Sequence, residues 1–238
     1  MLSVERLGKS FGSVEVIRNV TLTVNAGERL VILGPNGAGK TTLMRLIAGE
    51  IAPDTGHIRL DGQDVTALPP DARARAGLGR GFQTASLFES FSIAENLILA
   101  IAARMNGARF GRDPLKSHDL RHRARAAARQ VGIADPDAPV ASIDHGTRRR
   151  LDLALAMSGG AKLLLLDEPA SGFGPGGARE IHDLIAGLPK HLTLLVIEHD
   201  LDLAFAIADR IVILDAGGIA HEGPPSTARP VLRAIYDA

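Results

Sequence analysis

Short apolar runs of strand length dominate the first 33 residues of the chain. The segments LSVERL, VTLTV and RLVILG either alternate in polarity or run apolar, which predicts strands separated by turns. Further along, HIRLDGQDV places Asp61-Gly62 between two extended segments, and this dipeptide is a hairpin signal. The amino-terminal part of the chain is therefore predicted to contain an antiparallel β subdomain.

The pattern becomes helical from about residue 84 to 158, where SIAENLILAIAARM, DLRHRARAAARQVG and TRRRLDLALAM predict three helices. The polar stretch NGARFGRDPLKSHD between the first two predicts a surface loop. After residue 160, the strands KLLLLD, LTLLVIE and IVILD alternate with two helical segments, which is typical of a mainly parallel sheet covered on both faces. We expect a single α/β domain over 1–238, with a core of 1–83 and 159–238 and a helical subdomain inserted at 84–158.

The composition excludes several classes of protein. Lys plus Arg and Asp plus Glu both total 27, so no bulk charge attracts nucleic acid, and we expect no nucleic-acid partner. Cysteine is absent, which excludes disulfides and thiolate metal sites and fits a reducing compartment. No apolar run approaches the roughly 18 residues of a membrane span, and the charged start MLSVERLGKSFG is unlike a signal peptide. If the chain works at a membrane, another subunit must bring it there.

A glycine-rich segment, GPNGAGKTT, fits the phosphate-loop pattern G-x-x-x-x-G-K-S/T between an apolar strand and a helical segment. Its glycines allow successive backbone N–H groups to surround an anion, and the helix N-terminus adds its positive dipole end. Lys40 supplies a cation for the β- and γ-phosphates, and the Thr41 hydroxyl is a ligand for Mg²⁺. The predicted triphosphate site comprises Gly34, Pro35, Asn36, Gly37, Ala38, Gly39, Lys40, Thr41 and Thr42.

Four further residues complete a hydrolytic set. The strand KLLLLD delivers Asp167 to its carboxyl end as a Mg²⁺ ligand, and Glu168 follows as a general base for the attacking water. Gln83, at the end of a short strand, is placed to reach the metal or that water. His199 ends the strand LTLLVIE, where its imidazole could contact the γ-phosphate.

With these motifs in this order, the chain resembles the ATP-binding-cassette (ABC) ATPases over essentially its whole length. The resemblance rests on GPNGAGKTT, Gln83, LLLLDEP and His199. It implies a P-loop NTPase core, ATP and Mg²⁺ as cofactors, and hydrolysis of ATP to ADP and phosphate. It also implies that Phe11 stacks on adenine; the alternative is an ordinary buried strand residue.

Two segments compete for the family's signature, usually LSGGQ, whose leucine commonly lies about two dozen residues before the magnesium aspartate. Ile143 lies 167 − 143 = 24 residues before Asp167, whereas Met157 lies only ten before it. Ten residues cannot contain the intervening helix, so Met157-Ser158-Gly159-Gly160 is predicted to be the end of that helix. The signature is then IDHGT, with Asp144, His145 and Gly146 as the residues that face a nucleotide.

Asp144 replaces the family's serine and puts a negative charge where the γ-phosphate of the opposite subunit is bound. Coulomb repulsion should exceed the stabilisation from the helix dipole, unless Asp144 is protonated, turned away, or neutralised by His145 or Arg148-Arg149-Arg150. It also serves as a candidate helix cap. Gly174 stands where the family has an Asp or Asn that crosses to the partner. Both departures favour a head-to-tail heterodimer with a different ATPase subunit, although a homodimer stays possible.

Among ABC proteins, the forms GFQTASLFESFSIAENL and IEHDLDLAFAIADRIVIL resemble importer ATPases for branched-chain and other hydrophobic amino acids, or urea and short amides. This resemblance implies a peripheral subunit at the cytoplasmic face of the membrane, two permease subunits and, indirectly, an extracellular or periplasmic solute-binding protein. Phe88 is the candidate exposed anchor for a permease helix. The alternatives are a nucleotide-gated scaffold with little hydrolysis, and the ATPase of a lipid-type exporter.

Overall fold

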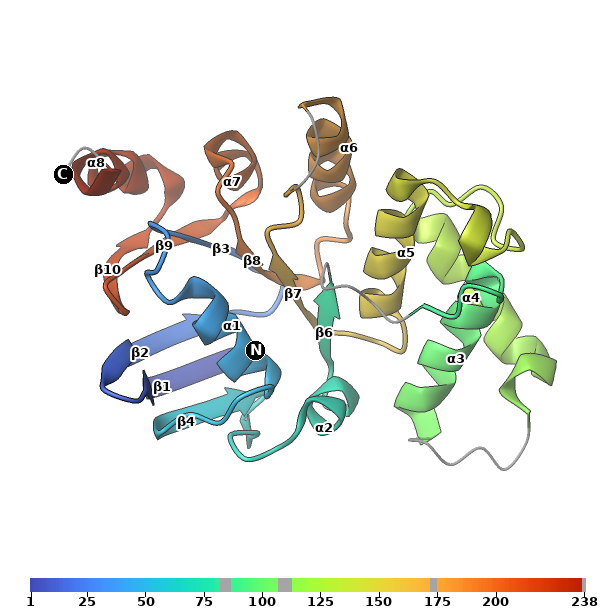
Figure 1. Cartoon of the computed structure of the whole chain (residues 1–238), viewed down its shortest axis with the longest axis horizontal. Coiled ribbons are helices and arrows are strands. Elements are labelled where there is room, and N and C mark those ends of the chain that lie inside the picture. Colours follow the sequence, from blue (N-terminus) through green and yellow to red (C-terminus); the bar gives the residue numbers. More distant parts are fainter. Residues whose placement is uncertain (82–86, 107–112, 172–174, 237–238) are drawn as a thin grey trace. The chain divides into compact units, whose positions relative to one another are not determined.

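The computed structural model describes residues 1–81, 87–106, 113–171 and 175–236. Two compact units divide the chain, one formed by Met1–Leu78 with Lys162–Ala238 and the other by Gly79–Ala161. Figure 1 labels the strands and helices and colours them by their position in the sequence. The expected helical insertion, 84–158, falls inside the range of the second unit.

An antiparallel sheet forms the amino-terminal part of the first unit, in the strand order β2-β1-β4-β5. Leu2 pairs with Val24 on one side and with Leu60 on the other. The turn at Asp61-Gly62 has positive φ at both residues, 48° and 80°, which fits a two-residue hairpin and confirms the prediction there. The strands are β1 (Leu2–Phe11), β2 (Val14–Val24), β4 (Thr55–Leu60) and β5 (Gln63–Asp64).

A second sheet has six strands in the order β10-β9-β3-β8-β7-β6. Its central strands pair in parallel, as the alternation of strands and helices predicted, and β10 pairs antiparallel to β9. We did not expect β10, because its sequence GIAHEG is short and only weakly apolar. The strands are β3 (Arg29–Leu33), β6 (Leu78–Gly81), β7 (Leu163–Asp167), β8 (Thr193–Ile197), β9 (Arg210–Asp215) and β10 (Gly218–Gly223).

Five helices lie among the described residues of the first unit. The short α2 was not expected, because six residues carry no helical period; it begins with Pro70, a favoured first residue. The carboxyl-terminal helix has 12 residues, begins at Pro225 and continues through Pro230. The helices are α1 (Lys40–Ala48), α2 (Pro70–Arg75), α6 (Pro175–Ala186), α7 (Leu201–Ile207) and α8 (Pro225–Tyr236).

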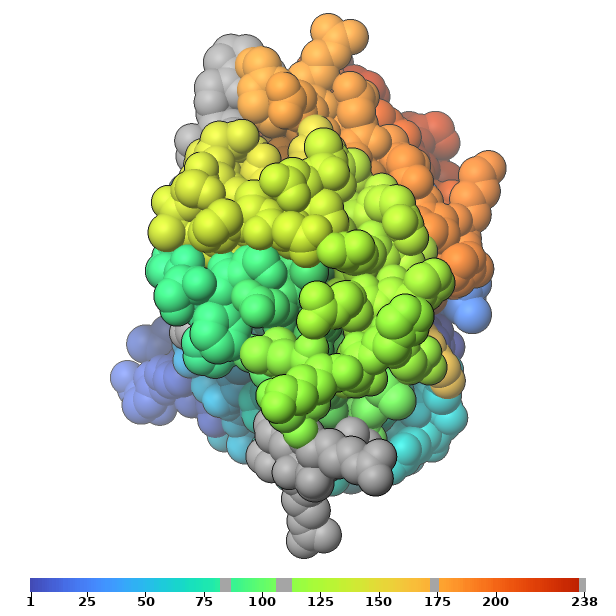
Figure 2. Space-filling view, turned by 90° about the vertical axis from the view of Figure 1, so that its right-hand side faces the viewer, coloured from blue at the N-terminus to red at the C-terminus, as the bar shows by residue number. Residues whose placement is uncertain are grey.

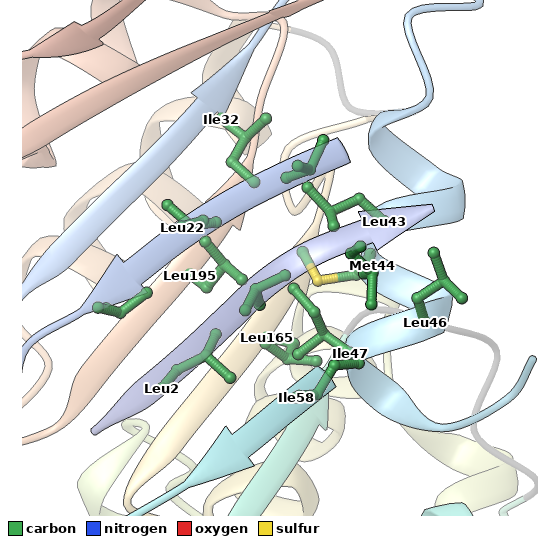
Figure 3. Packing of buried hydrophobic residues seen from close by; sticks show 14 of the residues in the cluster. Leu2, Leu22, Ile32, Leu43, Met44, Leu46, Ile47, Ile58, Leu165 and Leu195 are labelled. Carbon is green, nitrogen blue, oxygen red and sulfur yellow. The ribbon is translucent and has the colours of Figure 1, made fainter. Parts of the chain in front are cut away.

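The core of the first unit combines side chains of both sheets with those of α1. Leu43, Met44, Leu46 and Ile47 are the buried face of this helix. Figure 3 shows them packed with residues from the antiparallel sheet, such as Leu2, Leu22 and Ile58, and from the parallel sheet, such as Ile32, Leu165 and Leu195. Burial of this apolar area holds the start of α1, where the phosphate loop ends, in a fixed position.

One buried arginine closes the other end of α1. Arg73 is 1% exposed, and its guanidinium donates to the carbonyls of Leu46 at 2.6 Å and Ile47 at 2.8 Å. It also donates to the carbonyls of Leu68 and Thr66. A cation at a helix C-terminus satisfies carbonyls that have no helical partner and stabilises the negative dipole end. Burial lowers the pKa of Arg73.

The described part of the second unit is mainly helical, and residues 93–106 and 113–158 are coloured green to yellow in Figure 2. The three expected helices are confirmed. The predicted surface loop is only partly correct: residues 107–112 lie outside the described residues, whereas 113–119 hold η1 and the first residues of α4, capped by Asp113 and Ser117. The elements are α3 (Ile93–Asn106), η1 (Pro114–Lys116), α4 (His118–Gln130), η2 (Val140–Ser142) and α5 (His145–Met157).

Candidate nucleotide-binding site

Three neighbouring parallel strands of the first unit end at the candidate site. The phosphate loop follows β3, Asp167 is the last residue of β7, and His199 lies two residues after β8. In the sheet, β8 lies between β3 and β7. Since parallel strands present their carboxyl ends at one edge, the fold brings together three segments that are far apart in the sequence, and ligands of open α/β sheets bind at this edge.

Close packing explains two glycines of the phosphate loop. Gly34 has a φ of 144°, and a Cβ there would lie 2.0 Å from the carbonyl oxygen of Leu214. Gly39 has a φ of 96°, and its Cβ would lie 2.7 Å from the carbonyl oxygen of Val16. Neither position accepts a side chain, because both the backbone conformation and the space exclude one. The loop backbone is therefore open to the cavity in front of it.

The turn between β9 and β10 supports the phosphate loop from behind. Gly217 donates its N–H to the carbonyl of Ala38 at 3.2 Å and accepts from the N–H of Arg18 at 2.8 Å. Ala216 and Gly217 both have positive φ, 43° and 83°, as a tight hairpin turn requires. The strand that sequence analysis missed, β10, is thus part of the support of the site.

Lys40 is the buried cation at the start of α1, at 6% exposure. Its Nζ donates to the carbonyl oxygens of Gly34 at 2.7 Å and Pro35 at 2.9 Å. Burial lowers the pKa of Lys40, and the charges of Glu168 and Asp167 oppose that shift. Gly39, the N-cap of α1, provides no side-chain hydrogen bond to the helix. The positive end of the α1 dipole and the lysine therefore give this end of the helix a positive potential that suits an anion.

A cavity of about 200 Å³ lies in front of this loop. It joins the phosphate loop to the catalytic candidates, because Glu168 and His199 line it as well. His199 Nε2 lies 2.6 Å from Glu168 Oε1. Glu168 has a φ of 48°, an unusual backbone for a residue with a side chain and one found at functional sites. The lining residues are Val16, Asn36, Gly37, Gly39, Lys40, Thr41, Thr42, Glu168 and His199.

Some expected site residues lie elsewhere or outside the described residues. Gln83 and Gly174 are not described; the short strand before Gln83 ends at Gly81. Phe11 does not line the cavity, but it is 47% exposed at the end of β1, so the alternative of a buried strand residue is wrong. The Nζ of Lys9 lies 5.6 Å from the centre of its ring. An exposed aromatic ring is what base stacking requires.

The oxygen donors at the site fit Mg²⁺. Thr41 has an exposed hydroxyl in the cavity lining, and Asp167 is a half-buried carboxylate whose charge acts on Lys40. Within the described ranges, no cluster of three or more His, Cys, Asp or Glu side chains is placed to hold a metal ion. Mg²⁺ is usually held by one or two protein ligands together with nucleotide phosphates, so this small donor set is compatible with it.

In the second unit, α5 begins with a carboxylate cap. Asp144 accepts from the backbone N–H of Thr147 at 2.7 Å and from its hydroxyl at 3.1 Å. These hydrogen bonds lower the pKa of Asp144, which favours its ionised form in this structure. Arg148 forms a two-point ion pair with Glu89, at 2.8 and 2.9 Å, and its guanidinium is directed there. The cap predicted for this helix is confirmed.

The competing segment, MSGG, ends the same helix, as predicted. Ser158 is buried, and its hydroxyl donates to the carbonyl of Leu155 at 2.7 Å. Arg104 donates to the carbonyls of Ala156 at 3.3 Å and Ser158 at 2.7 Å. A Cβ on Gly159 would lie 2.6 Å from Arg104 Cδ, and Gly159 has a φ of 75°. A glycine is needed here because the helix ends with a positive φ, and because a Cβ would collide with the Arg104 side chain.

Sequence analysis missed two residues near the site. Val16 lines the cavity from β2, and its only signal was proximity in sequence to Phe11. Glu198 is 3% exposed beside His199 and accepts hydrogen bonds from backbone N–H groups. A glutamate immediately after the apolar strand LTLLVI was the available signal, because acidic residues are rarely buried without partners.

Comparison with known proteins agrees with this geometry. A family model described as "ABC transporter" matches residues 17–171. The branched-chain amino acid transport ATP-binding protein LivG of Escherichia coli K12 is 34% identical over 96% of this chain and 93% of its own length. The lipopolysaccharide export ATP-binding protein LptB of the same strain is also 34% identical, over 94% of this chain and 91% of its own.

The sulfate/thiosulfate import ATP-binding protein CysA 2 of Chromobacterium violaceum is 35% identical over 94% of this chain, which spans only 59% of that protein. A crystal structure of a nucleotide-free ATP-binding cassette from an ABC transporter superposes with a TM-score of 0.84 and 26% identity. The match covers 98% of this chain and 94% of that one. Among the described residues, no helix is both long and apolar enough to cross a bilayer. The chain belongs to the ABC transporter ATPase family and is an ATP-binding subunit that hydrolyses ATP to power transport.

Proposed function

We propose that this chain is the ATP-hydrolysing subunit of an importer for branched-chain or other hydrophobic amino acids. The observation that carries the proposal is the match to LivG, which extends over nearly the full length of both chains. LptB matches about as well, so an exporter of lipid-like cargo is the competing function. In either case the chain would act at the cytoplasmic face of the membrane, attached to two permease subunits; the importer would also have a solute-binding protein.

The residues at the site would each have a separate role in ATP hydrolysis. The amides from Gly37 to Thr41 and the Lys40 ammonium would hold the phosphates and stabilise charge that develops on the γ-phosphoryl group. Glu168 would accept a proton from the attacking water, and His199, 2.6 Å from Glu168, would orient that carboxylate and contact the γ-phosphate. Thr41 and Asp167, with Gln83, would hold Mg²⁺, which neutralises phosphate charge when bound.

The signature segment supports pairing with a second, different ATPase subunit. In a head-to-tail dimer, Asp144, His145 and Gly146 would face the nucleotide of the partner, whereas this chain's own phosphate loop would face the partner's signature. Asp144 is ionised and exposed, so it would repel that γ-phosphate. We therefore propose one competent site, built on this chain's phosphate loop, and one weakened site, built on the partner's.

Phe88 is the candidate contact residue for a helix of the permease. Its side chain is 55% exposed, and its ring stacks on Phe91 with 5.4 Å between the centres. Its backbone is held on both sides by Asn96, which accepts from the Phe88 N–H at 2.9 Å and donates to its carbonyl at 3.1 Å. A rigidly held, exposed aromatic is suited to bind a partner helix.

Reconstitution tests the importer. The chain would be tagged in its natural host, and the complex that it brings down would be placed in lipid vesicles. We expect leucine, together with the solute-binding protein, to stimulate hydrolysis several-fold. Stimulation by lipopolysaccharide instead would assign the exporter function.

Separate lysine substitutions test the asymmetric pair. Lys40→Ala in this chain and the equivalent lysine substitution in the partner would be assayed in the same complex. We expect the Lys40→Ala complex to lose nearly all hydrolysis and the other to retain most of it. Equal losses would contradict a weakened second site.

The same complex also tests the scaffold alternative, for which Asp144 and the Gly174 position are the supporting departures. We expect Glu168→Gln to reduce ATP turnover at least about 100-fold while nucleotide binding is kept, because a general base contributes about that factor. A wild-type complex that closes on ATP but turns over no faster than Glu168→Gln would favour the scaffold.

A further inference from the structure

A buried carboxylate with no assigned role, that of Glu198, lies immediately before His199. It is one of the few charged side chains buried in the core, at 3% exposure. One carboxylate oxygen accepts from the backbone N–H of His199 at 2.8 Å and of Asp200 at 3.1 Å. The other accepts from the N–H of Ala170 at 3.4 Å. The hydrogen bonds that this carboxylate accepts from described residues therefore all come from backbone donors of two different loops.

These two loops carry the two candidate catalytic side chains. Ala170 lies two residues after Glu168, on the loop that follows β7. His199 lies on the loop that follows β8. The backbone N–H of Glu198 also donates to the carbonyl of Ile32 at 3.3 Å, in the strand that leads into the phosphate loop. A single residue thus has hydrogen bonds to β3 and to the loops that follow β7 and β8.

We infer that Glu198 is a positioning residue for ATP hydrolysis, which holds the loop after Glu168 to the loop that carries His199. In this way it sets the 2.6 Å contact between His199 Nε2 and Glu168 Oε1. The inference rests on the proposed roles of Glu168 and His199 in hydrolysis, which it deepens.

The chemistry of the position requires a carboxylate. Two oxygens with about four lone-pair positions can accept from three N–H groups at once, and hydrogen bonds to a charged acceptor are the stronger ones. A glutamine side chain has a single acceptor oxygen and presents an NH₂ group on its other arm. That NH₂ group would face a backbone N–H donor, so the hydrogen bonds to at least one of the two loops must be lost.

The test is Glu198→Gln in the tagged complex, with Glu28→Gln as the matched control. Glu28 is a largely buried glutamate at the opposite end of β3, where it pairs with Arg210 at 2.6 Å. We expect Glu198→Gln to lower kcat at least tenfold, to leave the Kd for Mg-ATP within twofold of wild type, and to shift Tm no more than the control does. Glu28→Gln should leave kcat unchanged.

A double-mutant cycle separates positioning from a general loss of structure. If Glu198 acts through the His199 contact, Glu198→Gln should lower the residual kcat less than twofold in a His199→Ala background. A kcat within twofold of wild type in the single variant would overturn the inference, and so would the same factor of loss in both backgrounds. If Glu198→Gln fails to fold, Glu198→Asp replaces it under the same criteria, because its shorter carboxylate keeps the charge and withdraws from Ala170.

The outcomes also distinguish this inference from the proposed function. Full hydrolysis by Glu168→Gln would contradict the proposed function itself. A wild-type kcat for Glu198→Gln beside an inactive Glu168→Gln would contradict only the positioning role.

Discussion

Two helices of this chain, α1 and α5, begin in ways that have opposite consequences for an anion. α1 follows Gly39, which offers no side-chain cap to the first N–H groups of the helix, and Lys40 at this end lines the cavity. α5 follows Asp144, whose carboxylate already accepts from the Thr147 N–H at 2.7 Å. Both helix ends carry the same positive dipole. The residue before the helix therefore decides whether a side chain of the protein caps that end, as at α5, or leaves it uncapped, as proposed for a phosphate site at α1.

Removal of the cation at α1 should have the largest effect. Truncating one partner of a buried charged hydrogen bond costs about 2–5 kcal/mol, so Lys40→Ala should weaken Mg-ATP binding about 30-fold or more, measured by titration calorimetry. Lys162→Ala, at an exposed lysine paired with Asp61, is the control and should bind normally. Equal binding by Lys40→Ala and wild type would refute the assignment of the α1 end as the phosphate site.

Glycine-to-alanine changes at the two helix starts sharpen the comparison. Gly39→Ala places a Cβ 2.7 Å from the carbonyl of Val16 at a φ of 96°, and should lower the free energy of unfolding by about 2–4 kcal/mol. Gly146 has no such φ, and its Cβ would lie 3.3 Å from its own helix cap. Gly146→Ala should change stability by less than about 1 kcal/mol. Urea unfolding measures the free energy of unfolding of both variants. Similar losses of stability in Gly39→Ala and Gly146→Ala would contradict this prediction.

Two substitutions at Asp144 separate the cap from the charge. Asp144→Asn keeps an acceptor for the Thr147 N–H but removes the negative charge, so Tm should stay close to that of wild type. Asp144→Ala removes both and should lower Tm by about 2–4 °C, the usual effect of a lost cap in a chain of this size. In the assembled complex, Asp144→Asn should raise hydrolysis at the partner's site about tenfold, the effect of a modest gain in binding. No gain would show that the charge does not limit that site.

The smallest expected effect concerns a second acid of α5. Burial raises the pKa of Asp152 from 3.8 to about 6, against the opposing charges of Arg149, Arg148 and His145. A raised folded-state pKa favours the protonated form, so its stability contribution is full below pH 3.8 and is lost as the pH rises through about 6. Asp152→Asn should therefore be more stable than wild type by an amount on the order of 1 kcal/mol at pH 7.5, after allowance for solvent screening.

Parallel unfolding measurements at pH 5 and 7.5 check this expectation. The difference between Asp152→Asn and wild type should be smaller at pH 5 than at pH 7.5. A difference that is the same at both values would mean that the charge of Asp152 does not act on the fold.

Much of this architecture follows from local sequence patterns. The apolar strands, the phosphate loop and the end of α5 at Ser158 were predictable, because each depends on residues that are neighbours along the chain. The count of 24 residues from Ile143 to Asp167 identified the helix between them, and α5 occupies that interval. Asp144 as a helix cap was predictable for the same reason: it depends on spacing within one turn.

The long-range hydrogen bonds that hold these elements in place were not predictable from local patterns. Arg104, Glu198 and Gly217 contact carbonyls or N–H groups that lie 52, 28 and 179 positions away in sequence, respectively. No period or spacing rule connects two hydrogen-bonding groups that lie so far apart in the sequence, so only the folded chain identifies these contacts. Short elements such as α2 and β10 were missed because they contain too few residues for a periodic signal.

Arg73 has a consequence for how the chain moves. Its guanidinium holds the last carbonyls of α1. At the other end, Gly39 lets the first turn pack closely against β2, so both ends of this helix are packed on the same core. Its amides should then exchange with deuterium only through global opening, more slowly than those of α5. The amides of α1 would then already have the arrangement that an anion requires. The chain would lose little conformational entropy when an anion binds there.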